Sequence, residues 1–162
     1  MASQQQKSKT EPSLRDSWNT PQWLFDWANN RFHFNVDLAS TIANAKCLSF
    51  IDGDYVDSLK SDWAYLFEGL HYGWCNPPYS ETGKWLKKGW EEAQQGFCSV
   101  FLVPCPNGDL YMRDYVFGKA SEIIFIQGRV AFEAGGDFTV KGKKGKDGKP
   151  GTPDKHYKKG DP

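Results

Sequence analysis

Hydrophobic side chains recur at helical spacing in three segments of the chain. The first begins at Thr20-Pro21, where a hydroxyl N-cap followed by proline at the first helical position predicts a helix start. The second runs from Thr82 to Gln95 and the third from Asp109 to Lys119. The side chains expected to face a core are Trp23, Leu24, Trp27 and Ala28 in the first helix, and Trp85, Leu86, Trp90 and Ala93 in the second.

Shorter runs between these segments have the spacing of strands. Apolar and polar residues alternate from Phe32 to Leu38, and Phe97 to Val103 is almost continuously apolar, as in a strand covered on both faces. Because strands and helices alternate, the pattern favours an α/β fold with a mostly parallel central sheet. The remaining apolar runs are Cys47–Ile51, Leu70–Cys75, and Glu122–Gln127, which Gly128-Arg129 is expected to turn back into Val130–Phe132.

Composition divides the chain into three parts. Its 162 residues suit one domain, and 15% aromatic residues argue against general disorder. We expect a flexible arm over residues 1–15, a folded domain over residues 16–140 and a flexible basic segment over residues 141–162. The last part holds eight Lys and three Asp, so the formal net charge of zero hides a surplus of five positive charges there and an equal deficit before it.

Several classes of protein and site are not expected from this sequence. No apolar run approaches the roughly 18 residues that a membrane span needs, and the polar N-terminus has no signal-peptide core. The four cysteines form no C-x-x-C pair, and no histidine completes a metal-binding pattern with them. We therefore expect a cytoplasmic protein with free thiols, no metal and no membrane partner.

Asn76-Pro77-Pro78-Tyr79 is the most specific local motif, and it directly follows an apolar run. Two consecutive prolines remove two backbone donors and keep the chain extended, which leaves carbonyl oxygens facing outward at the carboxyl end of a strand. Asn76 adds a side-chain acceptor and Tyr79 a flat ring. Such a set suits the exocyclic amino group of a planar base that stacks on the ring. The alternative is a proline-rich turn with an Asn cap.

An ordered series of motifs, including this one, resembles the phage-type Dam family of DNA adenine-N6 methyltransferases. The resemblance runs from about Trp18 to Phe132 and is more specific than any single motif, since Asn-Pro-Pro-Tyr also occurs in methyltransferases acting on RNA or on glutamine. Its landmarks are Trp18-Asn19-Thr20-Pro21, Phe34-Asn35-Val36-Asp37-Leu38-Ala39-Ser40, Asn44-Ala45-Lys46-Cys47, Asp62-Trp63, Trp74-Cys75-Asn76-Pro77-Pro78-Tyr79-Ser80, Gly83-Lys84-Trp85, Phe101-Leu102-Val103-Pro104 and Gly128-Arg129-Val130-Ala131-Phe132.

The resemblance implies a Rossmann-like fold with helices on both faces of the sheet, S-adenosylmethionine as cofactor, and transfer of its methyl group to a flipped-out adenine in DNA. Asn76, Pro77, Pro78 and Tyr79 would hold the adenine N6. The residues it implies around the cofactor are Thr20, Pro21, Asp37, Ala39, Ser40 and Asp62. For Asp37 and Thr20 a helix N-cap is the alternative role, and for Asp62 it is a surface position.

The basic segment has two interpretations. Lys141, Lys143, Lys144 and Lys146 would contact DNA phosphates without reading sequence, or the segment is a solvated linker. Relatives usually continue to a last apolar strand, so the chain is expected to stop short of it. Two other functions remain open: a catalytically silent module that binds nucleic acid or cofactor, and a methyltransferase acting on RNA or protein glutamine.

Overall fold

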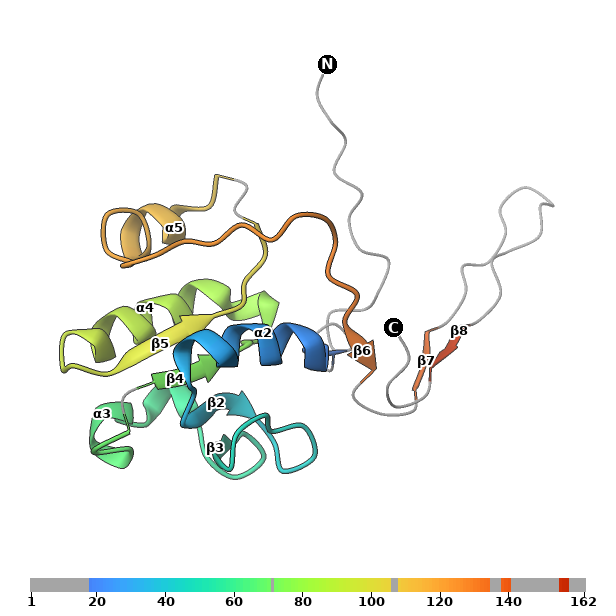
Figure 1. Cartoon of the computed structure of the whole chain (residues 1–162), viewed down its shortest axis with the longest axis horizontal. Coiled ribbons are helices and arrows are strands. Elements are labelled where there is room, and N and C mark those ends of the chain that lie inside the picture. The colour runs from blue at the N-terminus through green and yellow to red at the C-terminus, as the bar shows by residue number, and fades with distance from the viewer. Residues whose placement is uncertain (1–17, 71, 106–107, 135–137, 141–154, 158–162) are drawn as a thin grey trace, which may run out of the picture.

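A four-stranded parallel sheet forms the centre of the protein (Figure 1). The computed structural model describes residues 18–70, 72–105, 108–134, 138–140 and 155–157. The sheet has the order β3-β2-β4-β5, and all three pairings are parallel, which confirms the expected α/β class and parallel sheet. The four strands are each shorter than the apolar run that predicted them: β2 Val36–Ser40, β3 Ser49–Asp52, β4 Tyr72–Cys75 and β5 Cys98–Phe101.

Helices pack against both faces of this sheet. Trp74 and Cys75 are consecutive in β4 and therefore point to opposite faces. Trp74 packs with Phe25 and Ala28 of one helix, whereas Cys75 belongs to a cluster with Trp63 and Trp85 of two others. The helices are α2 Gln22–Phe32, α3 Trp63–Leu66, α4 Thr82–Ala93 and α5 Leu110–Tyr115, with short 3-10 helices η1 Ser58–Lys60 and η2 Tyr79–Glu81.

Two small antiparallel pairs join distant parts of the chain. β1 (Trp18–Asn19) pairs with β6 (Glu133–Ala134), so the first and last parts of the domain lie side by side. β7 (Phe138–Val140) pairs with β8 (Lys155–Tyr157). Three residues of the basic segment, Lys155–Tyr157, form β8, and the flexibility expected of that segment stays a prediction. The arm over residues 1–15 lies outside the described residues.

The first helix starts and ends differently from the prediction. Pro21, and not Thr20, is the N-cap residue of α2, and its carbonyl accepts from Leu24 N and Phe25 N at 3.1 and 3.2 Å. The helix continues to Phe32, where the predicted strand was to begin, and ends because His33 adopts a left-handed conformation with φ of 53°. Thr20 is instead a buried residue that makes no capping hydrogen bond.

The predicted hairpin over Glu122–Phe132 does not form, and the first part of this segment lies beside α2 instead. Residues 122–132 contain no strand, although Gly128 does turn with φ of 87°. Arg31 pairs with Glu122 at 2.8 Å, which ties this segment to α2. The apolar side chains of the two elements line a shared hollow: Trp23, Leu24, Trp27, Ile124, Phe125 and Ile126. Trp23 and Trp27 therefore lie on the outer side of α2 and stay partly exposed, contrary to the prediction.

The core-facing side of α4 also differs from the prediction in part. Trp85 and Leu86 are buried as expected. Ala93 is exposed, and Glu92 beside it is the residue that turns inward. The third helix is shorter than predicted, ending at Tyr115, and it packs on α4 through a cluster that contains Leu86, Met112 and Val116.

The connection between β2 and β3 leaves space at one edge of the sheet. Residues 41–48 carry the chain from β2 to the parallel strand β3 without a helix. The pairing of these strands is irregular between Asp37 and Ser40, a local disruption often found beside functional sites. The carboxyl ends of β2 and β4 border this space, where open α/β sheets bind their ligands.

Candidate active site

A cavity of about 550 Å³ lies at the carboxyl edge of the sheet. This volume falls within the range of small-molecule and cofactor sites. Its walls come from β1, the end of β2, the loop after it, the segment between β3 and η1, and the start of α4. The lining residues that carry the argument below are Asn19, Thr20, Asp37, Ala39, Ser40, Asn44, Lys46, Asp54, Asp57, Ser58, Leu59, Asn76, Pro78, Glu81 and Trp85.

Asp37 is a buried carboxylate at the floor of the cavity. Its Oδ1 accepts from Ala39 N at 3.2 Å and its Oδ2 from Lys46 N at 3.0 Å. Burial raises the pKa of Asp37 to about 6, against the lowering effect of these hydrogen bonds and of the Lys46 charge. Asp37 precedes no helix, so the N-cap alternative is wrong, and the carboxylate instead shapes the loop that follows β2.

The loop after β2 is held by a set of polar side chains. Asn44 Oδ1 accepts from Thr41 N at 2.7 Å, and Asn44 Nδ2 donates to Asn19 Oδ1 at 3.0 Å. Lys46 Nζ donates to Gln22 Oε1 at 2.9 Å. Lys46 is the only Lys or Arg among the described residues that line the cavity, whereas four acidic residues do so. The cavity is therefore acidic, with one cation at the side next to α2.

Asn76-Pro77-Pro78-Tyr79 forms the exit from β4. Leu102 N donates to Cys75 O at 2.9 Å, which holds the end of β4 against the chain beyond β5. Glu81 N donates to Pro78 O at 3.0 Å and Thr82 Oγ1 to Tyr79 O at 3.1 Å, so the motif leads directly into α4. These bonds fix the direction in which Asn76 and Tyr79 leave the sheet.

Tyr79 lies beside the cavity and not in its lining. Its ring meets that of Phe132 edge-on, with the centroids 5.9 Å apart and an interplanar angle of 87°. Burial raises the pKa of the Tyr79 hydroxyl well above its usual range, so the ring stays uncharged at neutral pH. Phe132, in the segment that leads into β6, therefore packs against Tyr79 of the Asn76–Tyr79 motif.

Three buried polar atoms at this site have no hydrogen-bond partner of normal geometry among the described residues. They are Ser40 Oγ, Asn76 Oδ1 and Trp85 Nε1, and all three residues line the cavity. An unpartnered buried polar atom costs free energy, and proteins usually satisfy such groups. Their concentration at one cavity indicates that a ligand with donors and acceptors completes the site.

The structure brings most, but not all, of the predicted site residues together. Pro21, Asp62, Pro77 and Tyr79 do not line the cavity. Asp62 caps α3, since its Oδ1 accepts from Tyr65 N at 2.9 Å. The four lysines predicted to contact DNA lie outside the described residues. The predicted residues that do line the cavity are Thr20, Asp37, Ala39, Ser40, Asn76 and Pro78.

Several residues of the site were not predicted. Lys46 and Trp85 line the cavity, and Phe132 contacts Tyr79. All three lie in motifs of the family resemblance, which is the only sequence signal that pointed to them. Their spacing gives no hint, because the fold and not the local sequence brings them to the edge of the sheet.

The thiols near Asp37 are not nucleophiles at neutral pH. Burial raises the pKa of Cys47 to about 12, and the charge of Asp37 adds to this. The same two causes raise the pKa of Cys75. All four cysteines are free.

In the part of the chain that the structure describes, no helix is long and apolar enough to cross a membrane. The described residues contain no group of three or more His, Cys, Asp or Glu side chains placed to hold a metal ion.

A parallel α/β sheet with a polar cavity at its carboxyl edge is typical of ligand-binding α/β proteins. A family model described as DNA N-6-adenine-methyltransferase (Dam) matches residues 7–152. Because this match covers most of the chain, the chain belongs to the Dam family of adenine-specific DNA methyltransferases.

Two phage proteins with that name are similar in sequence. The DNA N-6-adenine-methyltransferase of Haemophilus phage HP1 is 30% identical over 129 residues, which are 78% of this chain and 71% of the relative. The DNA N-6-adenine-methyltransferase of Escherichia phage T1 is 26% identical over 131 residues, 80% of this chain. The match spans about half, 52%, of the T1 protein's length. No solved structure matches this chain.

Proposed function

We propose that the cavity binds S-adenosylmethionine and that Asn76 and Tyr79 receive a flipped-out adenine at its rim. One observation carries this proposal. Asn76 Oδ1 is buried at the end of β4 without a partner among the described residues, on a residue that lines a cavity of cofactor size. An acceptor in that position suits the N–H groups of an adenine amine.

The charges of the cavity suit this cofactor. Asp37, Asp54, Asp57 and Glu81 would favour a ligand that carries a sulfonium and an ammonium group. Lys46 would favour its carboxylate, and the amino-acid end of the cofactor would then lie beside Lys46 and Thr20, which both line the cavity. When bound, the cofactor supplies an electrophilic methyl group on its sulfonium.

The chain's own residues would act on the acceptor base. Asn76 Oδ1 accepts a hydrogen bond from the amine, which stabilises the positive charge that develops on its nitrogen. Tyr79 supplies an uncharged ring for stacking, and Phe132 holds that ring from its edge. The prolines between them donate no hydrogen bond that would compete with the amine. These residues would therefore position and polarise the nitrogen, with no need for a catalytic cysteine or histidine.

Substitution of Asn76 or Tyr79 tests the proposal. We expect Asn76→Ala to lower the rate of methyl transfer to unmethylated DNA by about 10²-fold or more, the cost of losing one electrostatic contact in a transition state. Because Asn76 Oδ1 has no partner in the described fold, its loss should not lower the melting temperature. Tyr79→Ala should lower the rate as well.

Asn35→Ala and Tyr65→Ala are the matched controls, since both residues are exposed and lie away from the cavity. Labelled cofactor, with DNA, RNA and protein as separate acceptors, gives the rates and the acceptor class. Full activity of both Asn76→Ala and Tyr79→Ala would contradict the proposal. Cofactor binding without transfer to any acceptor would favour a catalytically silent module.

A further inference from the structure

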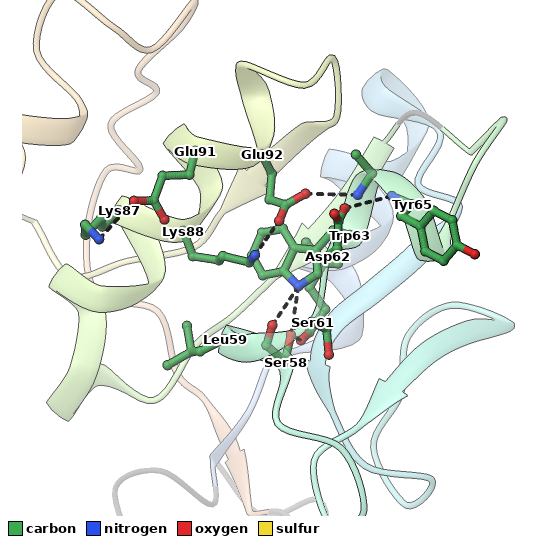
Figure 2. A network of polar contacts seen from close by, with 12 residues as sticks. Ser58, Leu59, Ser61, Asp62, Trp63, Tyr65, Lys87, Lys88, Glu91 and Glu92 are labelled. Carbon is green, nitrogen blue, oxygen red and sulfur yellow. Dashed lines mark hydrogen bonds and ion pairs between the residues drawn. The ribbon is translucent and has the colours of Figure 1, made fainter.

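Two neighbouring ion pairs of the same i,i+4 spacing lie on α4 (Figure 2), and they differ in burial. Lys87 pairs with Glu91 and Lys88 with Glu92, each four residues apart. The Lys87–Glu91 pair is about half exposed, whereas the side chain of Glu92 is 1% exposed. A buried carboxylate is rarely retained for stability alone, because apolar residues fill such a position at least as well. The presence of a carboxylate at the buried position 92 therefore needs an explanation that the exposed Glu91 does not need.

Glu92 holds α3 in place. One oxygen pairs with Lys88, and Oε2 accepts from Ala64 N at 2.9 Å in the first turn of α3. A helix of four residues is not stable by itself, so its position depends on contacts from outside. Figure 2 shows Glu92 reaching across from α4 to this turn.

Trp63 carries the contact onward from α3 to η1. Its side chain is fully buried, with Lys88 Nζ 5.5 Å from the ring centroid. Trp63 Nε1 donates to Ser58 O at 2.9 Å and approaches Ser58 Oγ at 3.2 Å. The position of η1 therefore follows that of the Trp63 indole.

The chain of contacts ends at the cavity. Ser58 Oγ donates to Leu38 O at 2.7 Å, which ties η1 to β2. Leu38, Ser58 and Leu59 all line the cavity, whereas Glu92 and Trp63 do not. Trp85, which also lines it, stacks on Trp63 with the centroids 6.3 Å apart.

We propose that Glu92 is a positioning residue of the cofactor cavity, acting through α3 and Trp63 on the wall formed by residues 57–59. This inference rests on the proposed function, because the cavity must bind the cofactor for its wall to matter. The Asp62-Trp63 landmark then has a structural role in the same unit: Asp62 caps α3, and Trp63 transmits its position.

Binding of S-adenosylmethionine to the full chain, measured by calorimetry well below the melting temperature, tests the inference. We expect Glu92→Ala to weaken cofactor binding about tenfold. The KM for DNA should stay unchanged. Glu92→Gln should bind close to the wild-type level, because the amide oxygen still accepts from Ala64 N. Glu91→Ala is the matched control, as it removes the exposed pair alone.

Trp63→Phe is a second variant that interrupts the same contacts further on, without removing the Glu92 carboxylate. It should weaken cofactor binding like Glu92→Ala, and the double variant should bind no more weakly than the weaker single one. The inference would be overturned if the two single losses of cofactor affinity multiplied in the double variant. It would also be overturned if Glu92→Ala bound cofactor as tightly as Glu91→Ala. Should the wild-type chain bind no cofactor at all, the proposed function fails instead.

If Glu92→Ala does not fold, Trp63→Phe and Glu92→Gln decide the matter. A Trp63→Phe variant that is folded and binds with wild-type affinity would overturn the inference. Weakened binding in Trp63→Phe with near-normal binding in Glu92→Gln supports it.

Discussion

Asp37 is a cavity residue whose acid–base chemistry is changed by its surroundings. It is buried at the floor of the cavity, it accepts two backbone hydrogen bonds, and its pKa is raised to about 6. An exposed aspartate is fully charged well below this pH. The carboxyl group of Asp37 therefore exchanges its proton closer to neutral pH than an exposed aspartate does.

The raised pKa predicts how Asp37 affects stability. Between the ordinary aspartate pKa of 3.8 and the raised pKa of about 6, the folded chain binds this proton more tightly than the unfolded chain does. The stabilisation is thus present at low pH and is lost as the pH rises through about 6, by about 3 kcal/mol at most. Urea unfolding of wild type and Asp37→Asn between pH 4 and pH 7.5 isolates this contribution, because all other groups cancel in the difference. A difference that does not change with pH would contradict the prediction.

At the scale of elements, α4 is the helix that links the core to the site. Its first residues follow the Asn76–Tyr79 motif, Trp85 reaches the cavity, and Glu92 holds α3. Gly89 allows it to lie close to the sheet. A Cβ atom at Gly89 would lie 2.4 Å from Phe101 Cε2 in β5.

We expect Gly89→Ala to lower the free energy of unfolding by about 1–3 kcal/mol, the usual cost of overpacking a core. This loss should appear although alanine favours the helix by about 1 kcal/mol. Gly83→Ala in the same helix is the control, since its Cβ would lie 3.3 Å from Tyr111 Cβ, a tight contact without the overlap found at Gly89. Chemical denaturation of both variants measures the two effects. Equal stability of the two variants would show that α4 can move away from β5 without cost.

The sequence predicted the strands of the central sheet and the helices α2, α4 and α5, because these elements depend on the local spacing of apolar residues. The sequence pattern wrongly predicted a strand at Glu122–Gln127, because an apolar run alone does not show whether it will pair with another strand or lie beside a helix such as α2. It identified Asn76 because two prolines at a strand end have a local consequence. It missed Glu92 because a charged side chain on an amphipathic helix normally faces water, and its burial depends on the ion pair with Lys88 together with a hydrogen bond from Ala64 in a distant segment.

At the scale of the whole molecule, charge is divided unevenly along the chain. Residues 141–162 carry a surplus of five positive charges, so the rest carries an equal deficit. The acidic residues at the cavity belong to this deficit and would suit a cationic cofactor, but not a polyanion such as DNA. Attraction to DNA must therefore come from elsewhere, and the Lys-rich segment remains our proposal for it.

Neutralising Lys141, Lys143, Lys144 and Lys146 to Gln tests that proposal without shortening the chain or removing β8. Each lysine that contacts a phosphate contributes about 0.9 to the slope of log affinity against log salt concentration. We therefore expect the slope to fall by up to about 4 in this variant. Substitution of Lys60, Lys84 and Lys87, which are paired with acidic residues, should change it little. An unchanged slope in the four-lysine variant would favour the solvated linker.

The pairing of β1 with β6 affects the order in which parts of the protein can fold during synthesis. Trp18 and Asn19 line the cavity, yet their partners Glu133 and Ala134 leave the ribosome after the whole sheet has been translated. Phe132, which supports Tyr79, arrives with them. A nascent chain can thus assemble its parallel sheet well before it has a finished ligand site. Trp18 and Asn19 gain their strand partners only when residues 133 and 134 have been made, so chains that end before β6 should bind cofactor more weakly than the complete domain does.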